Sequence, residues 1–219
     1  MRITTALAAG FAVAAAFAAP ASADHLDNPN LLVDPSFEGT PTTDGPPFIG
    51  SWEAFSSGAA ATADFTTTMP RTGDQSLEMN IDGEANQFAG AFQDVFFGTG
   101  VAGNNAYFSG WHALAGDAGG SEYRIEWRDS VSDTEVSRTQ LTASASGSAF
   151  EEFIIADVVP AGADTARIVY AIQSFGGALD QQVFADDFNF NIEGVAVPEP
   201  TSLALLGVSG LALLRRRRA

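Results

Sequence analysis

The sequence contains no cysteine, which excludes disulfides, thiol nucleophiles and cysteine-ligated metal sites. It also lacks lysine: all ten basic residues are arginines, and five of them, Arg2 and Arg215–Arg218, lie at the two ends. Between Asp24 and Glu199, 27 acidic residues stand against five arginines, a formal charge of −22. A surface with this charge repels nucleic acid and anionic lipid, and it favours solubility and divalent cations.

Long apolar runs are missing as well, and the two short ones lie near the ends. At the N-terminus, the basic start Met1–Arg2 precedes the apolar segment Ala6–Ala19 and the A-x-A sequence Ala21–Ala23. This order is typical of a secretory signal peptide. We therefore expect a signal helix within residues 1–23, cut before Asp24.

The C-terminal segment 195–219 combines a polar turn, a short apolar stretch and a basic end. The turn consists of Val197, Pro198, Glu199 and Pro200, and the basic end of Arg215, Arg216, Arg217 and Arg218. The predicted apolar helix, 201–214, would span only about 20 Å, against a hydrocarbon core of about 30 Å. The arginines would stop transfer and stay on the cytoplasmic side. The order is therefore that of a C-terminal sorting signal that is cut before the apolar segment.

These residues resemble the PEP-CTERM sorting domain. The resemblance implies transit through the secretion machinery and processing by an exosortase in the envelope of a Gram-negative-type bacterium. The protein would be held in the inner membrane by its tail before cleavage, and would then reach the cell surface or the extracellular matrix. An ordinary single-span anchor is the alternative, and both interpretations place residues 24–194 outside the cytoplasm.

Residues 24–194 are predicted to form one all-β domain. Apolar and polar residues alternate with period two in 77–81 and 123–128, as in half-buried strands. No segment of this region has a sustained 3.6-residue apolar stripe, and Gly, Pro and Asp turns recur every 8 to 15 residues. This pattern favours an antiparallel β-sandwich, most simply a jelly roll.

Six segments resemble, in order, the galactose-binding-like jelly rolls that include many carbohydrate-binding modules. They are Asn30–Thr40, Trp52, Arg71–Asn80, Ala106–Ala113, Tyr123–Asp129 and Val183–Phe190. The resemblance implies binding of extracellular polysaccharide and a structural calcium ion. The calcium ligands would be Glu38, Asp186 and the 73–76 turn that contains Ser76, in keeping with the preference of calcium for oxygen ligands. Alternatively, Glu38 and Asp186 bond only to backbone amides of that turn.

Exposed aromatic rings that stack on sugars are the expected binding groups. Trp52 follows a Pro/Gly loop and is the candidate sugar-stacking residue, whereas the alternating pattern around Trp127 predicts a core position. His112 is expected at the surface or in a loop, and it has no Ser and Asp partners at the spacing of a catalytic triad.

We therefore predict a non-enzymatic exported protein that binds extracellular polysaccharide. A structural matrix or floc protein whose acidic surface associates through divalent cations is the first alternative. A glycoside hydrolase-like enzyme is the second, since glycosidases need only two suitably spaced carboxylates and acidic pairs are abundant here.

Overall fold

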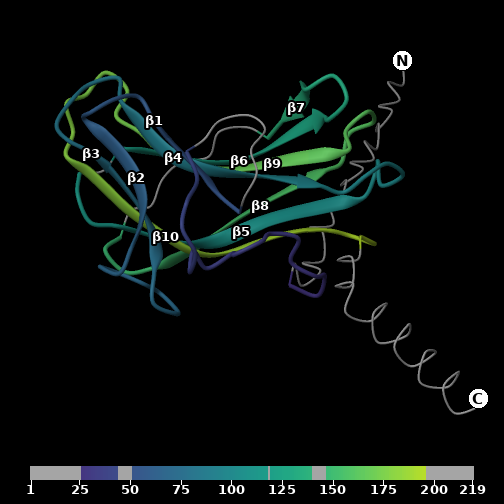
Figure 1. The fold of residues 1–219 in the computed structure, drawn as a ribbon, viewed down its shortest axis with the longest axis horizontal. Helices are drawn as coiled ribbons and strands as arrows, with labels where there is room; N and C mark the ends of the chain where they lie inside the picture. Colours follow the sequence, from purple (N-terminus) through teal and green to yellow (C-terminus); the bar gives the residue numbers. More distant parts are fainter. Residues whose placement is uncertain (1–25, 44–50, 118, 140–146, 196–219) are drawn as a thin grey trace, which may run out of the picture.

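The computed structural model describes residues 26–43, 51–117, 119–139 and 147–195. Within these ranges every regular element is a β-strand (Figure 1), and no helix has the length and hydrophobicity to cross a membrane. Several predicted features lie outside the described residues. They are the signal helix, the motif Val197–Pro200, the apolar helix 201–214 and Arg215–Arg218.

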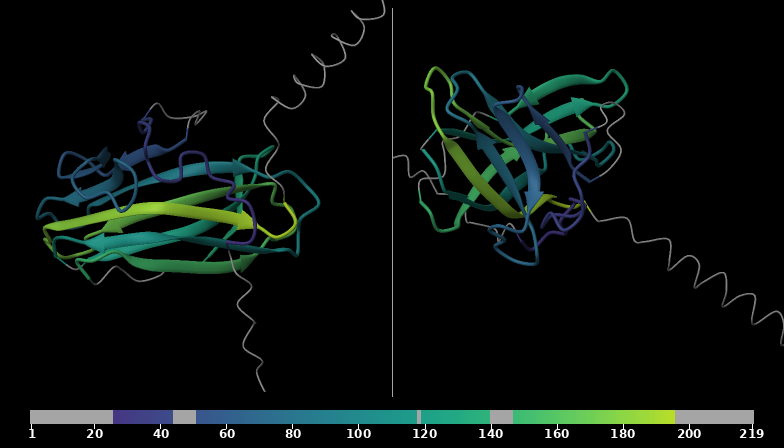
Figure 2. Two further views of the ribbon diagram at one scale, coloured as in Figure 1. Left: turned by 90° about the horizontal axis from the view of Figure 1, so that it is seen from below. Right: turned by 60° about the vertical axis from the view of Figure 1, so that its left-hand side comes forward.

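The strands are β1 (Glu53–Ser56), β2 (Ala61–Thr66), β3 (Ser76–Ile81), β4 (Phe88–Phe96), β5 (Asn105–Leu114), β6 (Gly120–Asp129), β7 (Thr134–Arg138), β8 (Glu151–Val158), β9 (Thr165–Gln173) and β10 (Gln181–Ile192). In the described part of the chain they form two five-stranded antiparallel sheets. The first sheet has the order β1-β4-β9-β6-β7 and the second the order β2-β3-β10-β5-β8. The left view of Figure 2 shows the strands running along the long axis of the sandwich. The predicted all-β antiparallel sandwich is confirmed.

The alternation that predicted strands also sets which side chains enter the core. On β3, Leu77, Met79 and Ile81 are buried. On β6, Tyr123 and Trp127 point inward, and the Trp127 indole N–H donates to Asp157 Oδ2 at 2.8 Å. The predicted core position of Trp127 is confirmed.

Aromatic rings fill the space between the sheets. Phe188 lies at the centre of this cluster, with ring centroids of Phe37, Phe108, Phe153 and Tyr170 between 5.0 and 5.6 Å away. Most of these contacts are edge-to-face or tilted, the arrangements that aromatic quadrupoles prefer. A cysteine-free domain can therefore be stabilised by close packing alone.

Strand β10 carries an irregularity that matters for the site residues. Its register with β5 shifts between Asp186 and Asn189, and Asp187 adopts the left-handed conformation with φ of 50°. A bulge of this kind re-aims neighbouring side chains. Regular alternation would send the two carboxylates to opposite faces. In the structure both of them instead contact the same loop, at Arg71 and Thr72.

Candidate functional site

The predicted metal-site residues all contact the loop 69–76, but each bonds to the protein itself. Glu38 Oε1 accepts the backbone N–H groups of Asp74 and Gln75 at 3.0 and 3.3 Å. The Ser76 hydroxyl donates to the carbonyl of Met69 at 2.9 Å. The structure therefore shows the bonding that the sequence left as the alternative to calcium, at least for Glu38.

Asp186 behaves in the same way at another part of the loop. Its Oδ2 accepts the N–H groups of Arg71 and Thr72 at 2.7 and 3.1 Å, and Oδ1 accepts that of Asp187 at 2.7 Å. Oxygens that face N–H donors do not fit a cation. The described residues also contain no group of three or more histidine or acidic residues placed to hold a metal. Calcium binding at this loop stays a prediction.

Trp52 lies in the core, so the prediction that it stacks on a sugar at the surface is wrong. It is only 1% exposed, and its ring packs on Phe37 and Phe188 at centroid distances of 5.0 and 5.6 Å. Its indole N–H donates to the carbonyl of Asp34 at 2.9 Å. The Pro/Gly loop before it suggested exposure, but the ring closes one end of the aromatic core.

His112 is also buried, against expectation. Its Nδ1 lies 2.6 Å from the Tyr170 hydroxyl, and Glu151 is 3.7 Å from Nε2. Burial lowers the pKa of His112, and the nearby Glu151 carboxylate opposes that shift only in part. His112 is therefore a neutral residue of the core that bonds to a tyrosine, and it does not lie at the surface.

The outer face of the β1-β4-β9-β6-β7 sheet holds a row of aromatic residues. On β4, the small residues Ala89 and Ala91 point into the core. Phe88 and Phe92 lie on the outer face, where Phe88 is 40% exposed and Phe92 only 8% exposed because the Arg167 guanidinium lies over its ring. Phe55 of β1 lies between them, with ring centroids 6.1 Å from each. We call Phe55, Phe88 and Phe92 the aromatic strip. It runs roughly 13 Å along β4, at the rise of a strand.

The strip lies flat because the sheet beneath it is built from small side chains. Phe55 is opposite Gly90, and a Cβ at Gly90 would lie 2.7 Å from the Phe55 ring. Beyond Gly90, β9 contributes Ala171, which forms a small apolar cluster with Phe92 and Val169. A larger residue at position 90 would therefore lift Phe55 off the sheet.

Charged groups border the strip along β9 and β6. The Arg167 guanidinium lies 4.2 Å above the Phe92 ring and forms two bonds with the Asp94 carboxylate at 2.7 and 2.8 Å. Glu122 pairs with Arg124, whose guanidinium also lies 2.6 Å from Glu126. Four of the five arginines outside the two ends, Arg124, Arg128, Arg138 and Arg167, lie on this face. Rings beside arginine and carboxylate groups can stack on sugars and bond to their hydroxyls.

The sequence did contain a signal for the strip. Phe88, Phe92 and Phe96 alternate with Ala89, Ala91 and Val95, so one face of this strand is aromatic and the other is small. The usual preference for large apolar residues inside would have placed the phenylalanines in the core. In the structure the small face, Ala89, Ala91 and Val95, enters the core instead, which also contains the large rings of Trp52, Phe188 and Tyr170.

Comparison with known proteins identifies the C-terminal end and the type of fold. Residues 196–218 match the PEP-CTERM protein-sorting motif. No curated protein matches the chain.

Solved structures with a similar sandwich include carbohydrate-binding modules. The N-terminal CBM22-1–CBM22-2 tandem domain of Paenibacillus barcinonensis Xyn10C is 20% identical, with a TM-score of 0.52 over 80% of this chain and 48% of that one. The enzymatically active domain of bacteriophage CBA120 tailspike protein 4 is 16% identical, with a TM-score of 0.52 over 74% of this chain. TmCBM61, solved with β-1,4-galactotriose, is 16% identical with a TM-score of 0.49, over 76% of this chain and 100% of that one.

The chain spans about a fifth of the tailspike structure, 21% of its length. Identities of this size show the fold alone. The protein thus combines a PEP-CTERM sorting motif at its C-terminus with a β-sandwich whose structural neighbours include carbohydrate-binding modules.

Proposed function

We propose that this protein is exported, sorted by an exosortase to the cell surface or matrix of a Gram-negative-type bacterium, and binds extracellular polysaccharide there without catalysis. The observation that carries the binding proposal is the aromatic strip, with apolar rings turned outward on a sheet whose small residues face the core. The sorting part rests on the motif at 196–218.

Polysaccharide binding would use both parts of this face. The apolar faces of pyranose rings would stack on Phe55 and Phe88, of which Phe88 is 40% exposed. Sugar hydroxyls would bond to the Arg167–Asp94 pair at one end of the strip, where charge-assisted hydrogen bonds are strong. Because two rings on β4 and the Phe55 ring from the adjacent β1 form a row, an extended chain fits the face better than a single sugar.

Strand connectivity supports the jelly-roll form of the sandwich. The chain crosses repeatedly between sheets: β3 and β5 lie in one sheet, whereas β4 and β6 lie in the other. Crossings of this kind bring strands from distant parts of the sequence together, as between β4 and β9.

The binding proposal is tested by isothermal titration and by retention on insoluble polysaccharide. The probes are xylan, β-1,4-galactan and the polysaccharide of the producing organism. We expect Phe55→Ala and Phe88→Ala each to weaken binding about tenfold, because each removes a stacking surface worth 1 kcal/mol or more. Ile154→Ala is the matched control, since Ile154 is 47% exposed on the second sheet. Absence of binding to every probe, or equal loss in the control, would refute the proposal.

A further inference from the structure

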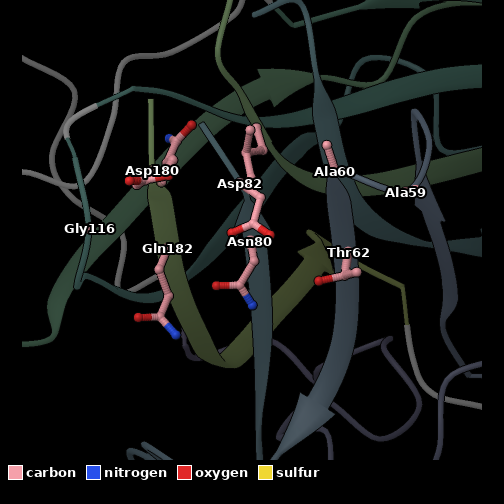
Figure 3. A pocket seen from close by; sticks show the side chains of 10 residues that line it. Ala59, Ala60, Thr62, Asn80, Asp82, Gly116, Asp180 and Gln182 are labelled. Carbon is pink, nitrogen blue, oxygen red and sulfur yellow. The ribbon is translucent and has the colours of Figure 1, made fainter. Parts of the chain in front are cut away.

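A polar cavity of about 490 Å³ lies on the outer face of the second sheet. Three of its lining residues, Thr62 of β2, Asn80 of β3 and Gln182 of β10, stand side by side in register across adjacent strands. Figure 3 shows their polar groups at one level, with the carboxylates of Asp82 and Asp180 at one end. The cavity therefore presents hydrogen-bonding groups from three strands and from the turns beyond them.

The two amides are oriented by a residue beside the cavity. Glu78 Oε1 accepts the Asn80 amide at 3.1 Å and the Gln182 amide at 2.6 Å. Because these NH₂ groups are directed to Glu78, the amide oxygens of Asn80 and Gln182 are left as acceptors. Together with the carboxylates of Asp82 and Asp180, they make the cavity rich in acceptors.

The walls of the cavity are held by backbone bonds, so its shape is built into the fold. The N–H of Asp117 donates to the Asp180 carbonyl at 2.7 Å, and the N–H of Gly83 donates to the Leu179 carbonyl at 3.2 Å. At Gly116, a Cβ would lie only 2.3 Å from the Asp180 carbonyl oxygen. Only glycine lets the two segments meet this closely.

The cavity carries negative charge that no arginine among the described residues balances by an ion pair. Four of those arginines lie on the outer face of the first sheet, and Arg71 pairs with Asp187. The described residues also hold no cluster of three acidic or histidine side chains at metal-binding spacing. An organic cation that carries several hydrogen-bond donors matches these groups better than a metal ion.

We propose that this cavity binds a protonated amino sugar of a polysaccharide. The ammonium group would lie between the carboxylates of Asp82 and Asp180, and sugar hydroxyls would donate to the oxygens of Asn80 and Gln182. An N-acetylated or neutral sugar has no cation for the carboxylates. This site lies on the opposite sheet from the aromatic strip and takes a different class of sugar, so it does not depend on the function proposed above.

The test is isothermal titration of the purified full-length chain with a glucosamine tetramer and, separately, with the N-acetylated tetramer. The pH is kept low enough to protonate the amines. We expect binding of the glucosamine tetramer and at least tenfold weaker binding of the acetylated one, because charge-assisted hydrogen bonds are lost. The double variant Asp82→Asn/Asp180→Asn should weaken glucosamine binding by about tenfold or more. Both side chains are exposed, so its melting temperature should stay unchanged.

Asp64→Asn is the matched control, because Asp64 lies on β2 two residues beyond Thr62, is exposed and does not line the cavity. It removes one negative charge, as Asp82→Asn and Asp180→Asn each do alone, and should change affinity less than twofold. Equal loss in Asp64→Asn would show general attraction to an acidic surface and overturn the proposal. Equal affinity for the two tetramers would also overturn it. The proposal would be overturned as well if the wild type bound calcium but no tetramer, and the double variant lost that calcium binding. Phe55→Ala should leave glucosamine binding intact, which separates failure of this site from failure of the strip.

Discussion

At the scale of single residues, Asp186 combines full burial with three backbone N–H bonds. Burial disfavours the charged carboxylate and raises the pKa of Asp186 to about 6, and the bonds from Arg71 and Thr72 oppose this shift without cancelling it. Its neighbour Asp187 shows the opposite result. There, bonds from Thr72, Arg71 and Ser36 outweigh burial and lower the pKa.

The raised pKa predicts a pH dependence of stability with a definite sign. The folded state holds the Asp186 proton more tightly than the unfolded chain, so the contribution of this group is full below about pH 4 and is lost as pH rises through 6. The loss is roughly 3 kcal/mol at most, from the difference between the ordinary pKa of 3.8 and the raised pKa of about 6. Urea unfolding of the wild type and of Asp186→Asn between pH 4 and 7 measures it. The wild type should lose stability relative to the variant, and parallel curves would contradict the assignment.

A second residue-scale prediction concerns the buried His112–Tyr170 pair. Tyr170→Phe removes the hydroxyl 2.6 Å from His112 Nδ1 and leaves a buried polar atom without that partner. We expect the free energy of unfolding at neutral pH to fall by about 1–3 kcal/mol. Burial lowers the pKa of His112, so this residue stabilises the fold above pH 6.5 and its contribution is lost as pH falls below that value. Burial is unchanged in the variant, so the same loss should be seen there. Unchanged stability would mean that the pair does not form.

At the scale of elements, the loop 69–76 is held from two directions. Glu38 accepts the N–H of Asp74 near the end of the loop, and Asp186 accepts the N–H of Arg71 near its beginning. The Arg71 guanidinium lies over the Trp111 ring, 3.8 Å from its centroid. An acidic residue on each side would suit a cation only if the N–H groups turned away. Instead, the backbone N–H groups of the loop donate to the two carboxylates, as in an anion-binding turn of the backbone.

Calcium therefore provides a direct test at this loop. With the N–H bonds as they are, we expect the melting temperature to be the same with millimolar calcium and with chelator. The comparison is repeated for Glu38→Gln, which keeps one acceptor but removes the charge. A rise in melting temperature with calcium that disappears in Glu38→Gln would instead place an ion here, as the family resemblance implies.

At the scale of the whole molecule, the acidic charge is distributed unevenly along the chain and over the two faces of the sandwich. The charge of −22 lies between Asp24 and Glu199, and this range contains only five arginines. Four of these are gathered on one outer face beside the aromatic strip, while the opposite face carries the acceptor-rich cavity. The two proposed binding sites therefore lie on different sheets of the sandwich.

Intact-mass spectrometry of the protein from its native envelope tests the processing prediction. We expect a mass without residues 1–23 and without Arg215–Arg218, because the signal peptide and the sorting tail are cut. Any further mass would report a group attached at the new C-terminus. A mass that includes all four arginines would show a plain anchor in place of a sorting signal.

The sequence by itself determined the elements, because alternation within a strand is local. Leu77, Met79 and Ile81, and likewise Tyr123 and Trp127, point inward as their spacing predicted. The segments at the two ends could also be identified without the fold, because targeting signals are recognised as linear sequence.

Only the tertiary structure decided which aromatic residues are exposed. Trp52 is buried because Phe37 and Phe188, one of them 136 positions away, close over it, and His112 is buried beside a tyrosine 58 positions away. Phe55 and Phe88 face outward, and the core on the other side of the sheet is built by rings from other strands. Sequence spacing settles which residues share a face of a strand, but the pairing of distant strands settles which face meets the core.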